Sequence, residues 1–127
     1  MADEGTLATT AQVLLAIGQN ASTAQVLEAN TNTWILMAEA EMEKAFGLIG
    51  ESPELVANYG GITESWKQWL ANIAADKAAW KAINQDQENW DLATTQSKLN
   101  ILDTTWQGFL SDLKNNSAEI VTGLGLD

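Results

Sequence analysis

The chain has 127 residues, a length that suits one domain, residues 1–127, with a single hydrophobic core. It contains no Cys, His or Arg, which excludes disulfides, thiolate metal sites, a histidine base and an arginine clamp for phosphate. The formal net charge of −11 argues against a sequence-independent grip on DNA or on an anionic membrane. We therefore expect a protein that is not an enzyme and that needs no cofactor or metal.

No apolar run approaches the ~20 residues of a membrane-spanning helix. The first four residues also lack the basic start of a signal peptide. We expect a soluble protein made inside the cell. The acidity is uneven: residues 1–64 carry nine acids against one Lys, for −8, and residues 65–127 carry eight acids against five Lys, for −3.

Two helices are predicted in the first half of the chain. Apolar residues at helical spacing favour the first over residues 6–17, ended by Gly18. Ser22 and Gln25 form a capping-box pattern at the start of the second, over residues 23–47. Residues 30–33 favour helix poorly, so this segment could be two pieces, the stronger one beginning near Thr33.

The second predicted helix carries acids on the side opposite its apolar stripe. Glu39 and Glu43 are four residues apart and resemble a catalytic pair, but nothing nearby indicates a buried pocket that would shift their pKa values. A solvated acidic face is the better interpretation. A short helix over residues 53–59 follows, with Ser52 as its N-cap and Pro53 in its first turn.

The segment 62–84 is the most strongly patterned part of the chain and predicts a helix over residues 63–84. Apolar residues recur on one face at spacings of three, four and seven, and four alanines fall on the other face. A helix that is apolar on two sides is either central or lies between its own core and a neighbouring subunit. The residues that we assign to a lateral contact between copies, as a hypothesis, are Trp66, Trp69, Ala71, Ala75, Ala78 and Ala82. An intramolecular core helix with alanines on a solvated side is an equal alternative.

A polar loop over residues 85–91 precedes the last long helix, predicted over residues 92–114 with Asp91 as its N-cap. Residues 118–127 alternate apolar residues with glycines and are either a frayed end or a tail that docks on a partner. The apolar residues of this tail are Ile120, Val121, Leu124 and Leu126. The fold class is all-α, a small antiparallel bundle of four principal helices with an extended C-terminal tail.

Sequence motifs for nucleotide binding, metal binding or nucleophilic catalysis are absent from the chain. Six Trp is a high number, but base stacking needs aromatic residues interleaved with basic ones. Here the Trp residues lie mostly on apolar stripes of an acidic protein, so we interpret them as core and interface anchors.

Several segments resemble, in order and spacing, the small head–tail adaptor (head completion) proteins of tailed bacteriophages. They are Val13–Ser22, Ala38–Met42, the loop Asp86–Trp90, and Leu99–Asp103. The resemblance spans roughly residues 7–114, and it is carried by the order of the segments rather than by any one of them. The family loop usually carries a Gly and a Tyr, where this chain has Glu88, Asn89 and Trp90.

The resemblance implies a virion structural protein, made in the host cytoplasm, that assembles as a ring, commonly of twelve copies, beneath the portal. Such a ring extends the DNA channel and offers a platform for the next tail component. No catalytic residue carries over from it. From the net charge we expect that the protein contacts no membrane and that DNA passes without specific binding. As a hypothesis, the acids Glu39, Glu41 and Glu43 of the first half border the channel and repel DNA; the alternative is that the net charge only keeps the protein soluble. The tail of residues 118–127 would suit docking on the portal.

Two other function classes remain open from the sequence. One is an intracellular helical module that binds a single partner, such as a regulator or a chaperone. The other is an enzyme that works with carboxylates and hydroxyls alone. A ring of copies on a portal would distinguish the adaptor from the partner-binding module. The enzyme would need a pocket with a Glu of raised pKa.

Overall fold

The computed structural model describes residues 5–18, 21–51, 53–85 and 92–125, and these form an all-α bundle with no strand. This confirms the predicted fold class. The elements in chain order are α1 (Thr10–Ile17), α2 (Thr23–Val26), α3 (Glu28–Leu48), the 3-10 helix η1 (Tyr59–Gly61), α4 (Glu64–Gln85) and α5 (Leu92–Leu124).

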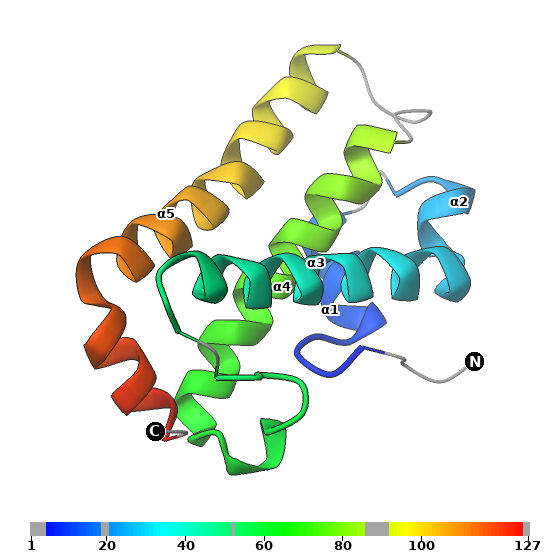
Figure 1. Cartoon of the computed structure of the whole chain (residues 1–127). Coiled ribbons are helices and arrows are strands. Elements are labelled where there is room, and N and C mark those ends of the chain that lie inside the picture. The colour runs from blue at the N-terminus through cyan, green and yellow to red at the C-terminus, as the bar shows by residue number, and fades with distance from the viewer. Residues whose placement is uncertain (1–4, 19–20, 52, 86–91, 126–127) are drawn as a thin grey trace.

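Helix α4 is the central element, because α1, α3 and α5 all pack against it. α5 runs antiparallel beside α4, and α3 crosses α4 and reaches α5 with its C-terminal end (Figure 1). At that end the rings of Phe46 and Phe109 meet edge to face, with centroids 5.9 Å apart. The central position predicted for the Trp-rich helix is therefore the one the structure has.

The alanine face of α4 lies inside the bundle and not between subunits. Ala71, Ala75, Ala78 and Ala82 are all buried in the single chain. Small side chains allow α1 and α3 to approach the α4 backbone closely, so the chain itself uses the thin face. The hypothesis that these four alanines form a lateral contact between copies is therefore wrong for this conformation, and so is the alternative of a solvated alanine side.

The first helix begins later than predicted, at Thr10 rather than residue 6. Thr9 and Gln12 form a capping box, with the Gln12 amide donating to the Thr9 hydroxyl at 3.1 Å. The preceding residues Leu7 and Ala8 are buried but not helical. Because these residues are buried outside a helix, their backbone N–H groups need other hydrogen-bond acceptors. Glu39 of α3 is the acceptor for Leu7.

The predicted helix over residues 23–47 is two helices, but the division falls at Leu27 and not near Thr33. Leu27 has extended dihedrals (φ −68°, ψ 122°), and the capping box of Ser22 and Gln25 is present at the start of α2. The hydroxyl of Thr31 donates to the Gln25 carbonyl at 2.9 Å. The side chain of this buried threonine, in the first turn of α3, therefore bridges the break between α2 and α3. Residue propensity alone does not predict such a contact.

The short helix predicted over residues 53–59 does not form. Glu54 has a left-handed backbone conformation (φ 51°), which ends any right-handed helix started at Pro53. Turns follow, and then η1. The predicted N-caps Ser52 and Asp91 lie outside the described residues.

Helix α5 contains a break at Asn116, whose dihedrals (φ −136°, ψ 30°) are not helical. The sequence predicts an end at this place. The chain instead resumes a helix, and the last turns fold back to the N-terminal end of α4 (Figure 1). There the Thr63 amide donates to the Leu124 carbonyl at 3.2 Å. Residues 118–124 are therefore a packed helix, and the prediction of an extended tail is wrong for them.

Candidate functional site

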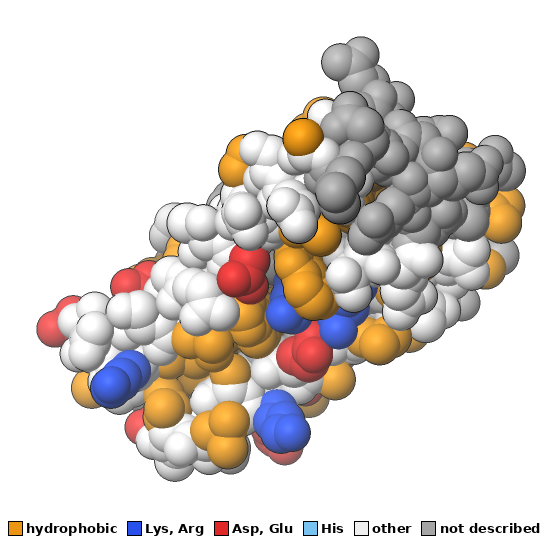
Figure 2. Space-filling view, turned by 90° about the horizontal axis from the view of Figure 1, so that it is seen from above, with side chains coloured by type: hydrophobic (Ala, Val, Ile, Leu, Met, Phe, Trp, Pro, Cys, Tyr) orange, Lys and Arg blue, Asp and Glu red, His pale blue; other side chains and the backbone are white. Residues whose placement is uncertain are grey.

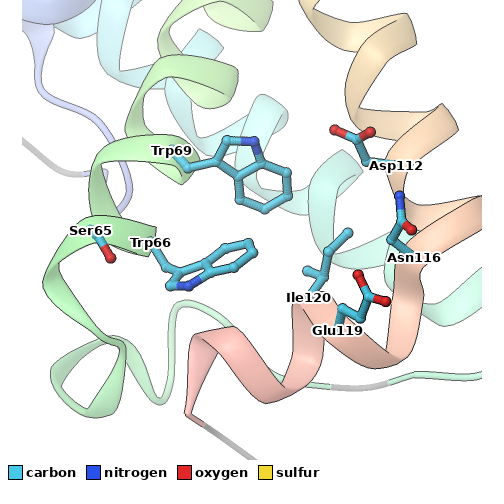
Figure 3. Close-up of a pocket in the computed structure, with 7 residues that line it drawn as sticks. All are labelled: Ser65, Trp66, Trp69, Asp112, Asn116, Glu119 and Ile120. Atoms are coloured by element: carbon cyan, nitrogen blue, oxygen red, sulfur yellow. The ribbon is translucent and has the colours of Figure 1, made fainter.

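The break in α5 creates a groove between its last turns and the first turns of α4, which we call the α4–α5 groove. Its volume is about 550 Å³. The indoles project from α4 towards the opposite wall on α5 (Figure 3). The lining residues are Ser65, Trp66, Trp69, Asp112, Asn116, Glu119 and Ile120.

The α4 wall is an aromatic cluster fixed by its neighbours. The rings of Trp66 and Trp69 meet edge to face with centroids 5.2 Å apart, and Trp69 lies 5.7 Å from the ring of Phe109 in α5. Behind Trp66 lies the backbone of Gly123, where an added Cβ would overlap the indole ring. Aromatic pairs of this geometry are worth about 0.5–1.5 kcal/mol beyond their buried area, so the wall is a firm surface.

The α5 wall combines apolar and acidic groups. Ile120 is buried, whereas Asp112 and Glu119 are exposed and stand on either side of the break at Asn116. The lining contains no Lys. Indole faces and carboxylates both attract cations, and the same indoles pack against apolar stems. The groove is therefore chemically suited to a lysine-type side chain with apolar neighbours.

The predicted interface tryptophans and the predicted docking tail meet at this groove. Trp66, Trp69 and Ile120 line it, Val121 is half-buried, and Leu124 is fully buried against the core. These residues are brought together by folding, although the sequence places them in two separate hypotheses. Leu126 lies outside the described residues.

One acid of the predicted acidic face of α3, Glu39, is not solvated. Glu39 is 3 % exposed and accepts hydrogen bonds from the backbone N–H groups of Thr6 (2.6 Å) and Leu7 (2.5 Å). Burial raises the pKa of Glu39; these hydrogen bonds oppose the rise, and the nearby charge of Glu43 adds to it. Glu39 therefore fastens the N-terminal segment to α3 and cannot border a channel in this conformation.

The other two predicted channel acids are also engaged within the chain. Glu41 forms an ion pair with Lys81 of α4, with Oε2 and Nζ 3.0 Å apart. Glu43 accepts a hydrogen bond from the backbone N–H of Val56 at 3.3 Å. These contacts tie α3 to α4 and to the loop before η1, which is a structural role.

A second cluster of charged and aromatic groups surrounds Lys77 in α4. Its Nζ lies 4.7 Å from the ring centroid of Trp80 and 4.6 Å from that of Trp106. Burial lowers the pKa of Lys77, the charge of Glu41 opposes this, Lys81 adds to the lowering, and Asp103 opposes it. A cation held between two indoles joins α4 to α5, and it is a contact that the spacing of tryptophans alone did not reveal.

The outward face of α3 is apolar. Its exposed large side chains are Leu36 (44 % exposed), Met37 (42 %) and Leu48 (78 %). Seen from above, the molecule has hydrophobic side chains at its surface between scattered charged groups (Figure 2). The sequence did not predict this face, because its residues lie outside both the apolar stripe and the acids that define the pattern of the segment.

Among the described residues, no group of three acidic side chains is arranged to hold a metal ion. The helices in the described ranges include none that is long and apolar enough to cross a bilayer. Comparison with protein-family models, with curated proteins and with solved structures finds no match for the chain.

Proposed function

We propose that this chain is a head-to-tail adaptor of a tailed bacteriophage, which forms a ring beneath the portal, extends the DNA channel and carries the next tail component. The observation that supports this proposal is the ordered series of segments Val13–Ser22, Ala38–Met42, Asp86–Trp90 and Leu99–Asp103, which resembles that family. The all-α bundle is the fold that the resemblance implies.

Two further features suit a structural role of this kind. The exposed apolar face of α3 offers a surface for protein contacts, since contiguous exposed apolar side chains mark such sites. The net charge of −11 suits a protein that adjoins DNA without gripping it, because few cationic groups are present to displace counterions. Twelve copies at −11 each would carry a formal charge of −132.

The test is to mix the purified chain with procapsids that carry the portal of the same phage, and to image the portal vertex by electron microscopy. A ring of additional density at the portal, absent without the chain, is the expected result. A chain that forms a one-to-one complex with a protein unrelated to the virion, and leaves the portal bare, would instead favour the helical partner-binding module.

A further inference from the structure

The outward face of α3 forms a continuous strip, which we call the α3 ridge: Leu36, Met37, Ala40, Lys44 and Leu48. Leu36, Ala40, Lys44 and Leu48 follow one another at intervals of four, and Met37 lies three residues before Ala40, so the five share one side of a helix. All five are exposed, and from Leu36 to Leu48 the strip is roughly 18 Å long at 1.5 Å per residue. Exposed large apolar side chains gathered in one strip are typical of surfaces that bind proteins.

The ridge carries one charged residue, and it is a cation. Lys44 makes no ion pair with any other residue that the structure describes, and its neighbours one turn away on the ridge are Ala40 and Leu48. Three acids of α3 have partners within the chain: Glu39 is buried, Glu41 pairs with Lys81, and Glu43 accepts a hydrogen bond from the loop before η1. In a chain of net charge −11, this strip carries one positive charge and no acid among its five residues.

The α4–α5 groove has the complementary chemistry. Trp66 and Trp69 give it an apolar aromatic wall, and Asp112 and Glu119 give it two negative charges. A lysine inserted there meets indole faces along its stem and carboxylates at its Nζ. A ridge of large apolar residues around one lysine and a groove of indoles around two carboxylates therefore match in both polarity and charge.

We propose that the α3 ridge of one copy docks in the α4–α5 groove of a second copy, with Lys44 between Asp112 and Glu119 and with Leu48 against the indoles. Two acidic copies repel over most of their surfaces, so a contact between them is favoured at a place where opposite charges meet. A contact between two different surfaces is heterologous, and repeated contacts of this kind close into a ring when the rotation allows. Only the ring's place beneath a portal rests on the proposed function.

The absence of cysteine makes the docking directly testable by disulfide formation. A Leu48→Cys chain and a Ser65→Cys chain, which carry tags of different length so that their dimers differ in size, are mixed at high concentration and oxidised. Each variant has one thiol, so a mixed dimer reports a contact between copies. Leu15→Cys is the matched control for Leu48→Cys, because Leu15 is 84 % exposed but lies on α1. We expect a several-fold higher yield of mixed dimer for Leu48→Cys with Ser65→Cys than for the control pair.

Charge reversal tests the role of Lys44. Adding Lys44→Glu to the Leu48→Cys chain should lower the yield several-fold, whereas Lys98→Glu, which changes the net charge equally but lies on α5, should leave it nearly unchanged. Adding Glu119→Lys to the Ser65→Cys chain should restore the yield with the Lys44→Glu partner. Circular dichroism of each variant confirms the fold.

The result that overturns the inference is a yield for Leu48→Cys no higher than for Leu15→Cys, or equal effects of Lys44→Glu and Lys98→Glu. Failure here is distinct from failure of the proposed function. A chain that decorates the portal but shows no ridge-to-groove disulfide keeps the function and loses this contact. A chain that gives the specific disulfide but leaves the portal bare does the reverse.

Discussion

At the scale of single residues, Glu39 is the clearest case of a side chain whose role depends on a distant partner. A glutamate between alanines on a helix reads as solvated, because its own segment contains nothing that would bury it. The partners are the N–H groups of Thr6 and Leu7, more than 30 residues away, in a buried stretch that is not helical. The sequence could identify the residue but not the fold-back that covers it.

Replacing Glu39 should separate its charge from its hydrogen bonds. In Glu39→Ala the buried N–H group of Leu7 loses its acceptor, so we expect a loss of about 1–3 kcal/mol of unfolding free energy. Glu39→Gln keeps an acceptor oxygen and should lose less. Chemical denaturation at neutral pH measures both, and equal losses would show that the hydrogen bond is not the main contribution.

The raised pKa of Glu39 also predicts how stability depends on pH. Between the ordinary glutamate pKa and the raised value in the fold, the folded chain binds more protons than the unfolded chain. The contribution of Glu39 to stability is therefore greatest below the ordinary pKa and falls as the pH rises through this window. Glu43 faces the same carboxyl and contributes to the shift. Plots of unfolding free energy against pH for the original chain and for Glu39→Gln should differ in slope inside this window and run parallel outside it. Identical pH profiles throughout would contradict the assignment.

The pH dependence of stability that Lys77 contributes has the opposite sign. The lowered pKa of Lys77 means that the unfolded chain binds more protons between the folded and the ordinary lysine values, so stability rises with pH there. Lys77→Met removes a partly buried charge and keeps a long stem between the two indoles. We expect it to preserve or raise the melting temperature at neutral pH and to remove this alkaline slope. A marked loss of stability would show that the cation–indole contacts outweigh burial.

At the scale of elements, the helices with strong stripes were predicted well and the breaks were predicted unevenly. The position of α4 as the central helix followed from its two apolar sides. The helix end predicted after residue 114 lies close to the break at Asn116, but local propensity does not show whether a chain stops or turns back. That depends on the fit of Gly123 against Trp66, a contact between residues far apart in sequence.

Gly123 provides the test of this fold-back. In Gly123→Ala the new Cβ would overlap the Trp66 ring, so we expect the last turns to shift and stability to fall by about 1–3 kcal/mol, with a change in tryptophan fluorescence. The matched control is Gly108→Ala in the same helix, where the added Cβ meets nothing within 4 Å. There we expect a gain of up to roughly 1 kcal/mol. Similar effects at both positions would mean that the contact is unimportant.

At the scale of the whole molecule, composition set the limits on function, and only the tertiary structure located the candidate surfaces. The exclusions that rest on missing Cys, His and Arg needed no structure. The groove did, because its walls come from two helices whose relative placement depends on the α5 break. The interface predicted on the alanine face was wrong since small residues serve close packing within a chain as well as between chains.

The net charge leads to a last prediction, on ionic strength. Two copies at −11 each repel at long range, whereas the proposed contact brings together a few opposite charges at short range. The Debye length falls from ~30 Å at 0.01 M salt to ~8 Å at 0.15 M, so added salt screens the long-range repulsion most. We therefore expect the yield of the Leu48→Cys with Ser65→Cys dimer to rise over this range. The rise should be steeper with Lys44→Glu, which adds repulsion at the contact itself. A yield that falls steadily with salt would show instead that local ion pairs dominate the association.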